Sequence, residues 1–515
     1  MIETALLGID LGTGSVKAIV VDAADGRILG QGSAPYPIER PVPGGAEQAP
    51  AAWWSATRAA VRHAVLESGG ANVAAISLSG QMHGTVTLGE TGEPIGNAII
   101  WEDTRSAGSA EVITREVGKT RLLAITGSPI AAGFQAATAH WLQRRQPERW
   151  HRTATLLLPK DWLRYRLTGA IATEPSDAAS TLLLDRQTRD WSPVMLAAAG
   201  IERPQLPEIV PSGAVSGALS LAAAGALGLV PGTPVVAGSA DAPAAALGAG
   251  ITRPGELLVT ISTGAQVLTP LAEPRFDSLG RLHTFCTPFE PGGWDAAWYC
   301  MGATMAAGLA LRWLRDDVFA GDLTYDDMTA LAADVPIGAG GLLFLPYLAG
   351  ERTPHLNPNA RGAFIGLDAG HTRGHLIRAV LEGVSLSIFD AWTTLKEVMT
   401  TTPERIVLAG GGARSPCWRQ LLADLFGLPV RPLHGGEQSA FGAALLAASA
   451  LGRDPAELAQ RWVAYGVDVS PDRHAHERYQ SLVPLFREAY ASHVDLFEQL
   501  AAWRELRGRY GEGRT

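Results

Sequence analysis

The sequence has 515 residues, too many for a single hydrophobic core, and predicts roughly two to four domains of ~150 residues each. Apolar residues make up 47% of the chain and charged residues 18%, proportions that are typical of globular proteins. The net charge of −9 and the lack of runs rich in lysine or arginine argue against a nucleic-acid-binding surface.

The sequence also indicates the cellular compartment in which the protein is expected. Residues 1–4 lack a basic region followed by an apolar one, so we expect no signal peptide. The longest apolar stretch, residues 218–230, is too short and too rich in alanine and glycine to span a membrane. A reducing cytoplasm is the simplest expectation, because the cysteines are few, distant and odd in number, which predicts neither a disulfide framework nor a zinc site. They are Cys286, Cys300 and Cys417.

Residues 6–21 (LLGIDLGTGSVKAIVV) consist of two apolar runs joined by a short glycine-rich segment, which predicts a β-hairpin. Gly12 and Gly14 open backbone conformations that are closed to other residues, and they let a ligand approach the turn closely. The hydroxyl groups of Thr13 and Ser15 add to the backbone N–H donors of the turn. Such a cluster of donors suits a phosphate group.

Asp10 is the single acid in the first of these apolar runs. Burying an unpaired carboxylate is costly, so a purely structural role explains this residue poorly. A hydrated Mg²⁺ ion that accompanies phosphate groups would suit it better. The alternative is an ordinary glycine-rich hairpin with an acid at the end of its strand.

The next segments place a polar turn after a buried strand. We expect a strand at residues 28–38, a helix at residues 48–68 and a buried strand at residues 73–78 that runs into a Ser-Gly-Gln-Met-His-Gly turn. Met82 and His83 in this turn are well placed to line a ligand crevice at the end of the strand. The alternative is a turn histidine that its neighbours satisfy.

Residues 98–105 (AIIWEDTR) repeat this arrangement of a buried strand and a polar turn. Trp101 offers an apolar ring face, while Asp103 and Arg105 offer strong hydrogen bonds, a combination that suits a polyhydroxylated ligand. The alternative is a surface Asp–Arg pair of little energetic weight. The elements expected next are helices at residues 111–125 and 136–146, a strand turning into a helix at 156–168, and a loop at 174–185 that leads to an apolar segment.

Residues 231–250 (PGTPVVAGSADAPAAALGAG) contain the second conspicuous acid, Asp241. A short strand at residues 235–237 runs towards it, and Pro243 fits the first turn of the helix that follows. A carboxylate near a helix N-terminus is stabilised there, so a pure capping role competes with a catalytic role for Asp241.

Residues 255–268 (GELLVTISTGAQVL) repeat the opening pattern of an apolar run, a turn with hydroxyl groups and glycine, and a second apolar run. This second phosphate-type hairpin predicts a duplicated architecture with a cleft between the two halves of the chain. After it we expect a strand-rich segment over residues 257–295 and a helix at residues 301–314.

A strand at residues 405–408 leads into three consecutive glycines that precede a helix at residues 418–426. Three glycines permit close approach of a nucleotide, whereas a plain connection would not need them, so the pattern favours a ligand. The other expectations for this part are a turn-rich segment at 341–366, a long amphipathic helix at 376–398, a buried helix at 439–451 and a frayed end at 504–515.

The motifs that are present suit one kind of chemistry. The sequence has no Walker motif, no G-x-G-x-x-G after the first strand, no H-E-x-x-H and no G-x-S-x-G. It does have two hydroxyl- and glycine-bearing hairpins, a triple-glycine turn, and two acids at strand ends, Asp10 and Asp241. That set suits phosphoryl transfer from ATP, in which positioning and charge neutralisation dominate and a carboxylate accepts the proton of the acceptor hydroxyl.

Several stretches, in one order along nearly the whole chain, resemble the FGGY carbohydrate kinases of the actin-like ATPase superfamily. They are GIDLGTGSVKAIVVD, SGQMHG, WEDTR, LLPKDWLRYRLTG, VVAGSADAPAAALG, YLAGERTPHLNPNARGAFIGL and LAGGGARSPCWRQLLADLFGLPV. Within that family, SGQMHG is similar to the xylulokinases. The resemblance implies an α/β fold of two actin-like (ribonuclease H-like) domains, with mixed sheets flanked by helices and an interdomain cleft. Residues 1–250 would form the sugar-binding N-terminal domain with the first phosphate hairpin, and residues 251–515 the nucleotide-binding C-terminal domain with the C-terminal helices.

The resemblance also implies roles for individual residues. Asp241 matches the general base, which would take the proton from the sugar hydroxyl, O5 in xylulose. Asp10 matches the acid near the Mg²⁺–phosphate site, and both acids would hold the metal through water. The expected sugar contacts are Met82, His83 and Asp103, with Trp101 added from its aromatic face. The expected ATP contacts are Thr13, Thr263, Gly264, Gly412 and Ala413, with Gly14, Ser15 and Gly411 added from the glycine-rich turns.

Several positions depart from the family pattern, two of them near the sugar. Ala242 and Pro243 follow Asp241, where the family's xylulokinases usually have Asn, and Glu102 replaces the Asn of a Trp-Asn-Asp stretch. Thr138 stands where the first family signature expects a lysine, and the second hairpin has Ser-Thr-Gly in place of Gly-Thr-Ser.

The leading hypothesis is ATP-dependent phosphorylation of a ketopentose, D-xylulose to D-xylulose 5-phosphate, with ATP and Mg²⁺. The alternatives are a kinase of the same family for another ketopentose or a polyol, such as ribulose or erythritol, a non-catalytic relative that binds sugar and nucleotide, and an actin- or heat-shock-type ATPase. The retained Asp10, Asp241 and glycine-rich turns speak against a loss of catalysis. The expected partners are the sugar and ATP, with no nucleic acid and no membrane, and a homodimer is the habit of the family.

Overall fold

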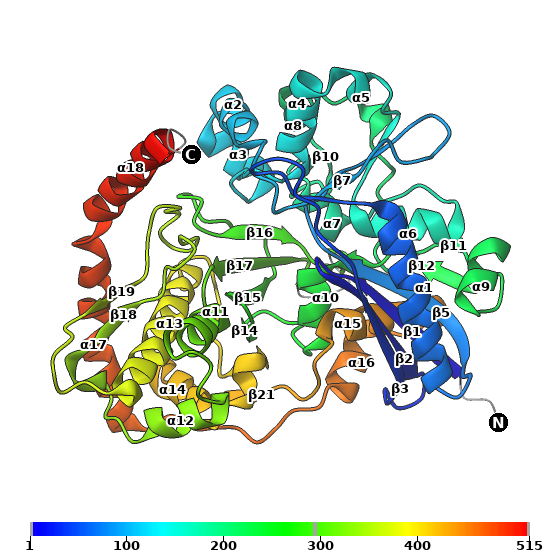
Figure 1. Cartoon of the computed structure of the whole chain (residues 1–515). Helices are drawn as coiled ribbons and strands as arrows, with labels where there is room; N and C mark the ends of the chain where they lie inside the picture. Colours follow the sequence, from blue (N-terminus) through cyan, green and yellow to red (C-terminus); the bar gives the residue numbers. More distant parts are fainter. Residues whose placement is uncertain (1–3, 292–295, 512–515) are drawn as a thin grey trace. The chain divides into compact units, whose positions relative to one another are not determined.

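The computed structural model describes residues 4–291 and 296–511, with the backbone alone for residues 505–511. The chain divides into two compact units (Figure 1). The first unit contains Met1–Pro254, Pro270–Cys300 and Glu437–Ala464, and the second contains Gly255–Thr269, Met301–Gly436 and Tyr465–Thr515.

The first sheet lies in the first unit and has the strand order β11-β12-β5-β1-β2-β3, with the short β13 also paired to β5. β1 and β2 are antiparallel, which confirms the predicted opening hairpin. β5 runs parallel to β1 on one side and to β12 and β13 on the other. The strands are β1 (Thr4–Leu11), β2 (Ser15–Asp22), β3 (Ile28–Pro35), β5 (Asn72–Gly80), β11 (Val215–Ala218), β12 (Pro234–Val236) and β13 (Ser239–Ala240). The helices that cover the sheet include α1 (Pro50–Glu67), α10 (Asp241–Gly248) and α15 (Gln438–Ala447).

The side chains of β1 alternate between two hydrophobic layers. Leu7 and Ile9 belong to the core formed with α1, whereas Leu6 packs in a separate core with α15. Successive residues of a strand point to opposite faces of the sheet, so Gly8 and Asp10 share the α15 face with Leu6. The alternation thus places Asp10 near the carboxyl end of β1 on the α15 side.

Glycines let α15 approach the sheet and α10 closely. A Cβ atom on Gly8 would collide with a backbone oxygen of α15, and one on Gly442 of α15 would collide with the carbonyl oxygen of Ala244. This packing holds residues 437–464 in the first unit. Residues 270–300 also belong to the first unit, so both compact units are discontinuous in the sequence.

The second sheet has the strand order β16-β17-β15-β14-β20-β21. β14 and β15 are antiparallel, as predicted for the second hairpin, and β14 runs parallel to β20. A hairpin with a parallel neighbour is also the arrangement of β1, β2 and β5, so the structure repeats the same strand pattern in each half of the chain. The strands are β14 (Leu257–Ile261), β15 (Ala265–Leu271), β16 (His283–Cys286), β17 (Trp298–Thr304), β20 (Ile406–Gly410) and β21 (Val430–Pro432).

Two predicted helices differ from the structure. The helix predicted at residues 301–314 is strand β17 followed by the shorter helix α11 (Gly308–Trp313), because a continuous apolar run does not distinguish a buried strand from a buried helix. The helix predicted at residues 111–125 is two helices, α2 (Ala107–Val117) and α3 (Lys119–Thr126). Gly118 separates them with a φ of 84°, a conformation outside the helical region.

Two further segments are more helical than predicted. The loop predicted at residues 174–185 begins with the short helix α7 (Pro175–Ser180), which the Glu174 side chain caps. The end predicted to fray from residue 504 continues helix α18 (Val494–Gly511), and the last four residues of that prediction lie outside the described part of the chain.

The other helices and strands occupy the connections. They are β4 (Glu47–Gln48), β6 (Val86–Leu88), β7 (Ala98–Ile99), α4 (Gln135–Arg145), α5 (Pro147–His151), β8 (Thr155–Leu157), α6 (Pro159–Thr168), β9 (Leu184–Asp185), β10 (Asp190–Trp191), α8 (Pro193–Ala199), α9 (Leu221–Leu227), α12 (Tyr325–Ala333), β18 (Leu343–Leu345), β19 (Ala363–Ile365), α13 (Arg373–Lys396), α14 (Pro416–Phe426), α16 (Pro455–Trp462) and α17 (Arg473–Ala491). Of these, α4, α6, α13 and α14 lie in segments predicted to contain helices. None of the helices in the described residues has both the length and the apolar character needed to cross a membrane.

Replacing Gly442 by alanine should destabilise the first unit, although alanine is the better helix former, because the added Cβ atom has no room beside Ala244. We expect the free energy of unfolding in urea to fall by about 1–3 kcal/mol. Gly225 of α9 is the matched control, since a Cβ atom there meets no atom within 4 Å. The Gly225→Ala change should stabilise the protein by about 0.5–1 kcal/mol. Equal responses to the two substitutions would contradict the close packing of α15.

Candidate active site

Asp10 is a buried acid next to the last residue of β1. Its Oδ1 atom accepts a 2.8 Å hydrogen bond from the hydroxyl group of Ser79 on β5. Burial raises the pKa of Asp10 to about 6, whereas the Ser79 hydrogen bond and the charge of Lys17 lower it and the charge of Glu437 raises it. The raised pKa follows from burial and distinguishes Asp10 from a solvated acid at a strand end.

Asp241 is the first residue of α10 and directly follows β13, which confirms its predicted place at a helix N-terminus. In the sheet, Ser79 has Asp10 as its register partner on one side and Ser239 on the other, so the two acids flank the carboxyl end of β5. Burial raises the pKa of Asp241 to about 7, and the charge of Asp10 raises it further, against the lowering effect of the N–H groups of Ala242 and Asp241.

The two carboxylates fit the charge and chemistry of a hydrated cation. Because the charge of Asp10 raises the pKa of Asp241, a cation near both groups would relieve their repulsion. Mg²⁺ prefers oxygen ligands and usually keeps several of its waters. Within residues 4–291 and 296–511, no group of three or more His, Cys, Asp and Glu side chains forms a metal-binding cluster.

His83 and Met82, the predicted sugar contacts, follow the end of β5 in the same unit as the two acids. The Nδ1 atom of His83 is 2.7 Å from the carbonyl oxygen of Ser180, so Nδ1 carries a hydrogen and donates it to that oxygen. The His83 ring stacks on Phe134 with a centroid distance of 3.8 Å and an interplanar angle of 4°. These two contacts fix the orientation of the imidazole.

Tyr299 links Met82 to the neighbourhood of Asp241. Its hydroxyl group donates a hydrogen bond to the Met82 sulfur at 3.9 Å. Burial raises the pKa of Tyr299 well above its usual value, and the charge of Asp241 adds to this effect. The structure therefore gathers Met82, Tyr299 and Asp241 in one part of the first unit.

Trp101 and Asp103 lie after β7, and the structure gives them different partners. The indole N–H of Trp101 donates a 2.9 Å hydrogen bond to the Thr13 hydroxyl, which ties this turn to the glycine-rich hairpin. The carboxylate of Asp103 is 2% exposed and accepts hydrogen bonds from the backbone N–H of Ala46 and from Arg105. Asp103 is thus engaged in a buried ion pair with Arg105, and a sugar hydroxyl would have to share its oxygens.

The turn between β1 and β2 holds the first predicted phosphate contacts, Thr13, Gly14 and Ser15. Neither glycine of the turn has a positive φ, so the special backbone conformation expected for them is not used. A Cβ atom on Gly14 would meet no protein atom within 4 Å, which leaves close approach of a ligand as a reason for glycine there. Tyr36 and Gln48, which the sequence does not indicate, donate hydrogen bonds to the carbonyl oxygens of this turn.

A cavity of about 790 Å³ lies in the second unit beside the turn of the β14–β15 hairpin. This volume is within the range of ~300–1,000 Å³ that is usual for small-molecule and cofactor sites. Of the predicted ATP contacts, Thr263, Gly411 and Gly412 line the cavity, and Gly264 and Ala413 are their chain neighbours. Other lining residues include Ser262, Gly308, Arg312, Arg315, Tyr325, Arg414 and Ser415.

The triple-glycine turn after β20 has a packing role as well as a place at the cavity. Gly410 has a φ of 82°, and a Cβ atom on it would collide with the carbonyl oxygen of Ile261 on β14. A Cβ atom on Gly412 would lie 2.7 Å from the Ile261 side chain, whereas one on Gly411 would have its nearest neighbour at 4.0 Å. Packing therefore explains two of the three glycines, and Gly411 is the one that a ligand can approach.

Phe134, Ser180 and Tyr299 contact the predicted sugar-binding residues, and sequence reasoning missed them. They lie in segments far from the motifs along the chain, and Phe134 and Tyr299 stand in apolar surroundings that predict only core packing. No spacing rule brings such distant residues together, so the sequence offers no local signal for them.

Comparison with known proteins identifies the family of the chain. The model of the FGGY family of carbohydrate kinases, N-terminal domain, matches residues 5–248, and the C-terminal domain model matches residues 257–451. The chain belongs to the FGGY family of carbohydrate kinases. It is therefore a sugar kinase, and both the predicted family and the predicted α/β fold of two actin-like domains are confirmed.

Among similar proteins, the xylulose kinase of Bacillus subtilis is 36% identical over 504 residues, which cover 97% of this chain and 99% of the relative. The xylulose kinase of Escherichia coli is 35% identical, with coverage of 93% and 99%. The crystal structure of xylulose kinase from Rhodospirillum rubrum has a TM-score of 0.88 and 31% identity, with coverage of 96% and 100%.

Alanine in place of Gly14 should impair turnover without impairing the fold. The position has room for a Cβ atom and no positive φ, so the melting temperature should stay at the native value. If phosphate groups pass over this turn, the methyl group should lower kcat/KM for ATP by about tenfold or more. Steady-state kinetics with varied ATP measure this, with Gly225→Ala as the control that also adds a methyl group in open space. Native kinetics for Gly14→Ala would contradict the predicted phosphate contact.

Proposed function

We propose that this kinase transfers the γ-phosphoryl group of ATP to D-xylulose and forms D-xylulose 5-phosphate. The observation that carries the proposal is the gathering of Met82 and Tyr299 near Asp241 at the carboxyl ends of β5 and β13. The several relatives that are named xylulose kinases and align over nearly the full chain support the choice of sugar.

Asp241 is the proposed general base. A catalytic base works best when its pKa lies near the working pH, and burial brings the pKa of Asp241 to about 7. At that value a large fraction of the carboxylate is ionised at neutral pH and can accept the proton of the attacking sugar hydroxyl. Its fixed place at the start of α10 keeps the carboxylate oriented.

The sugar is held by groups that the protein has already oriented. The ring of His83 is held by Phe134 and Ser180, and its Nε2 atom would be the contact to a sugar hydroxyl. Met82 offers an apolar contact to the carbon skeleton beside the Tyr299 hydroxyl. Trp101, fixed by its bond to Thr13, would cover another part of the ligand.

ATP is the proposed phosphoryl donor, and the cavity in the second unit is the proposed place for its nucleoside and phosphates. Thr263 and Gly411 line this cavity and match the predicted cradle. Asp10 and Asp241 would hold Mg²⁺ through water, and the bound ion would neutralise charge on the transferring phosphoryl group.

A second candidate is a different sugar or polyol for the same reaction. The Glu102 side chain, which departs from the family pattern, forms an ion pair with Arg40 at 2.6 Å within the protein. Ala242 presents a methyl group where an amide is usual, which removes a hydrogen-bonding group next to Asp241. A gluconokinase of Bacillus subtilis is also 31% identical over 93% of this chain, so the family likeness alone does not select one sugar.

ADP release with Mg²⁺ and ATP should be fastest with D-xylulose in a panel that also contains L-xylulose, D-ribulose, L-ribulose, erythritol, glycerol and D-gluconate. Changing Asp241 to Asn should lower kcat by about 10²–10⁴-fold, the usual contribution of a general base. Asp25→Asn makes the same chemical change at a side chain that is 62% exposed and should leave turnover unchanged. A higher kcat/KM for another compound would move the proposal to that compound, and native turnover in Asp241→Asn would remove the proposed base.

The fall of kcat/KM at low pH should follow the protonation of Asp241. The carboxylate must be ionised to act as a base, so activity should fall below pH 7 by about tenfold per pH unit at subsaturating substrates. The charge of Asp10 raises the pKa of Asp241, so the residual kcat/KM of Asp10→Asn should begin to fall at a lower pH than that of the native enzyme. A pH–rate profile of both proteins between pH 5 and 9 tests this. A fall of kcat/KM at the same pH in both would contradict the effect of the Asp10 charge on Asp241.

A further inference from the structure

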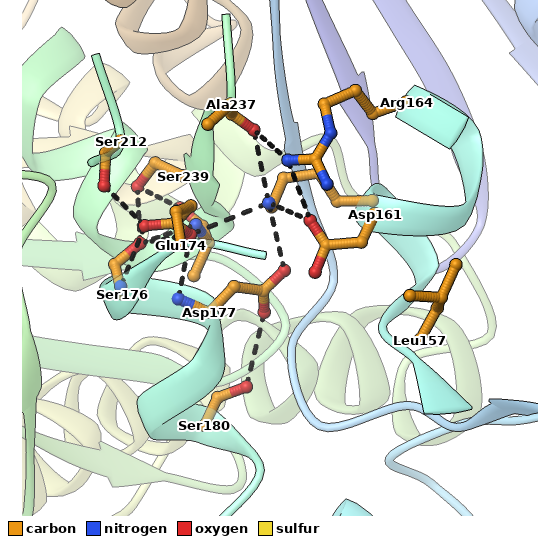
Figure 2. Close-up of polar contacts among 12 residues, drawn as sticks. Leu157, Asp161, Arg164, Glu174, Ser176, Asp177, Ser180, Ser212, Ala237 and Ser239 are labelled. Carbon is orange, nitrogen blue, oxygen red and sulfur yellow. Dashed lines mark hydrogen bonds and ion pairs between the residues drawn. The ribbon is translucent and has the colours of Figure 1, made fainter. Parts of the chain in front are cut away.

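A cluster of buried charges lies in the first unit, on α6 and around α7. The side chains of Lys160, Asp161, Arg164, Glu174 and Asp177 are all 0% exposed. The Nζ atom of Lys160 is 2.7 Å from Asp161 and 3.6 Å from both Glu174 and Asp177. Figure 2 shows Asp161, Arg164, Glu174 and Asp177 with their polar neighbours. Burying such groups is costly unless they are paired, so the cluster fixes these side chains in one arrangement.

The N-terminal end of α7 is bonded to the segment that delivers Asp241. The carboxylate of Glu174 accepts hydrogen bonds from the backbone N–H and the hydroxyl group of Ser176, both at 2.8 Å. The same Ser176 hydroxyl accepts a 3.0 Å hydrogen bond from the N–H of Ala240, the residue directly before Asp241. Ser176 thus connects the charged cluster to the backbone next to the proposed base.

The C-terminal end of α7 is bonded to the proposed sugar contact. The carbonyl oxygen of Ser180 lies 2.7 Å from Nδ1 of His83, and the Ser180 hydroxyl accepts a 3.2 Å hydrogen bond from the His83 N–H. The hydroxyl group donates in turn to Asp177 at 3.3 Å. One short helix therefore has hydrogen bonds beside Asp241 at its start and to His83 at its end.

The cluster also holds the strand end before Asp241. Lys160 and Arg164 donate hydrogen bonds to the carbonyl oxygen of Ala237, at 3.4 and 3.2 Å. Ser212 donates a 2.6 Å hydrogen bond to Glu174. Side chains of the same buried cluster thus hydrogen-bond the segment before Asp241 and cap α7, so the positions of the two segments depend on each other.

We propose that α7 sets the separation between the base Asp241 and the sugar contact His83, and that Ser176 and Ser180 are its positioning residues. The helix has six residues and a length of about 9 Å, and its hydrogen bonds at both ends have fixed lengths. A shift of about 1 Å in a reacting group can cost about 100-fold in rate, so a rigid spacer between these two groups has a direct use. The inference rests on the proposed roles of Asp241 and His83.

Two serines of the same cluster separate positioning from stability. Ser176 and Ser212 both donate to the Glu174 carboxylate and both are 0% exposed, but Ser176 is the one that accepts the Ala240 N–H. Replacing either serine with alanine removes a buried hydroxyl donor from the same carboxylate. Ser176→Ala also removes the acceptor of the Ala240 N–H, so its melting temperature should fall further than that of Ser212→Ala, and both falls are measured before the kinetics are compared.

Steady-state kinetics of the variants, measured well below their melting temperatures, test the inference. Ser176→Ala should lower kcat by about 100-fold with little change in the KM for the sugar, and Ser212→Ala should keep kcat within about threefold of the native value. Ser180→Ala should mainly raise the KM for the sugar, by about tenfold, because it loosens His83 rather than Asp241.

The outcomes that overturn the inference differ from those that overturn the proposed function. Equal kcat values for Ser176→Ala and Ser212→Ala, with Asp241→Asn inactive, would make the cluster a stabilising element only and would leave the proposed base in place. Native turnover in Asp241→Asn would remove the proposed base, and the inference with it.

Discussion

Two like charges beside the carboxyl end of β5 are the constraint on which the candidate site of the first unit depends. Asp10 and Asp241 flank the carboxyl end of β5, where the charge of Asp10 raises the cost of ionising Asp241. The Ser79 hydroxyl and the start of α10 offset part of this cost, yet both pKa values stay raised. The remaining imbalance favours a cation near the pair and leaves Asp241 able to accept a proton near neutral pH. A pair fully neutralised by the protein would have neither property.

The candidate ligand-binding parts of the two units are built differently. The first unit uses side chains that a buried polar network holds in place, with α7 bonded beside Asp241 and to His83. The second unit uses closely packed backbone turns around a cavity, with Gly411 as the open position. The difference suits the proposed ligands, because a small sugar must be oriented by a few groups, whereas a nucleotide needs room and backbone donors.

Glycine has two opposite uses in this chain. Gly8 and Gly442 let α15 lie against β1 and α10, and Gly410 lets the turn after β20 pack on Ile261, so these positions have no room for a side chain. Gly14 has open space around it, and the fold does not require it. Only the space around each glycine distinguishes a packing role from a ligand-binding role, and glycine in the sequence looks the same in both cases.

The sequence by itself determined the two hairpins with their glycine-rich turns, the acid at the end of β1, the helix start at Asp241 and the family, because these depend on local periodicity and short motifs. Only the tertiary structure decided that α15 returns to the first unit, and that Phe134, Ser180 and Tyr299 join the site. The structure also has the helix α7 where a loop was expected after Glu174, and the buried ion pair of Glu174 is with Lys160 from another segment. The physical reason is that side chains far apart in the chain meet through packing and charge pairing, and neither leaves a period in the sequence.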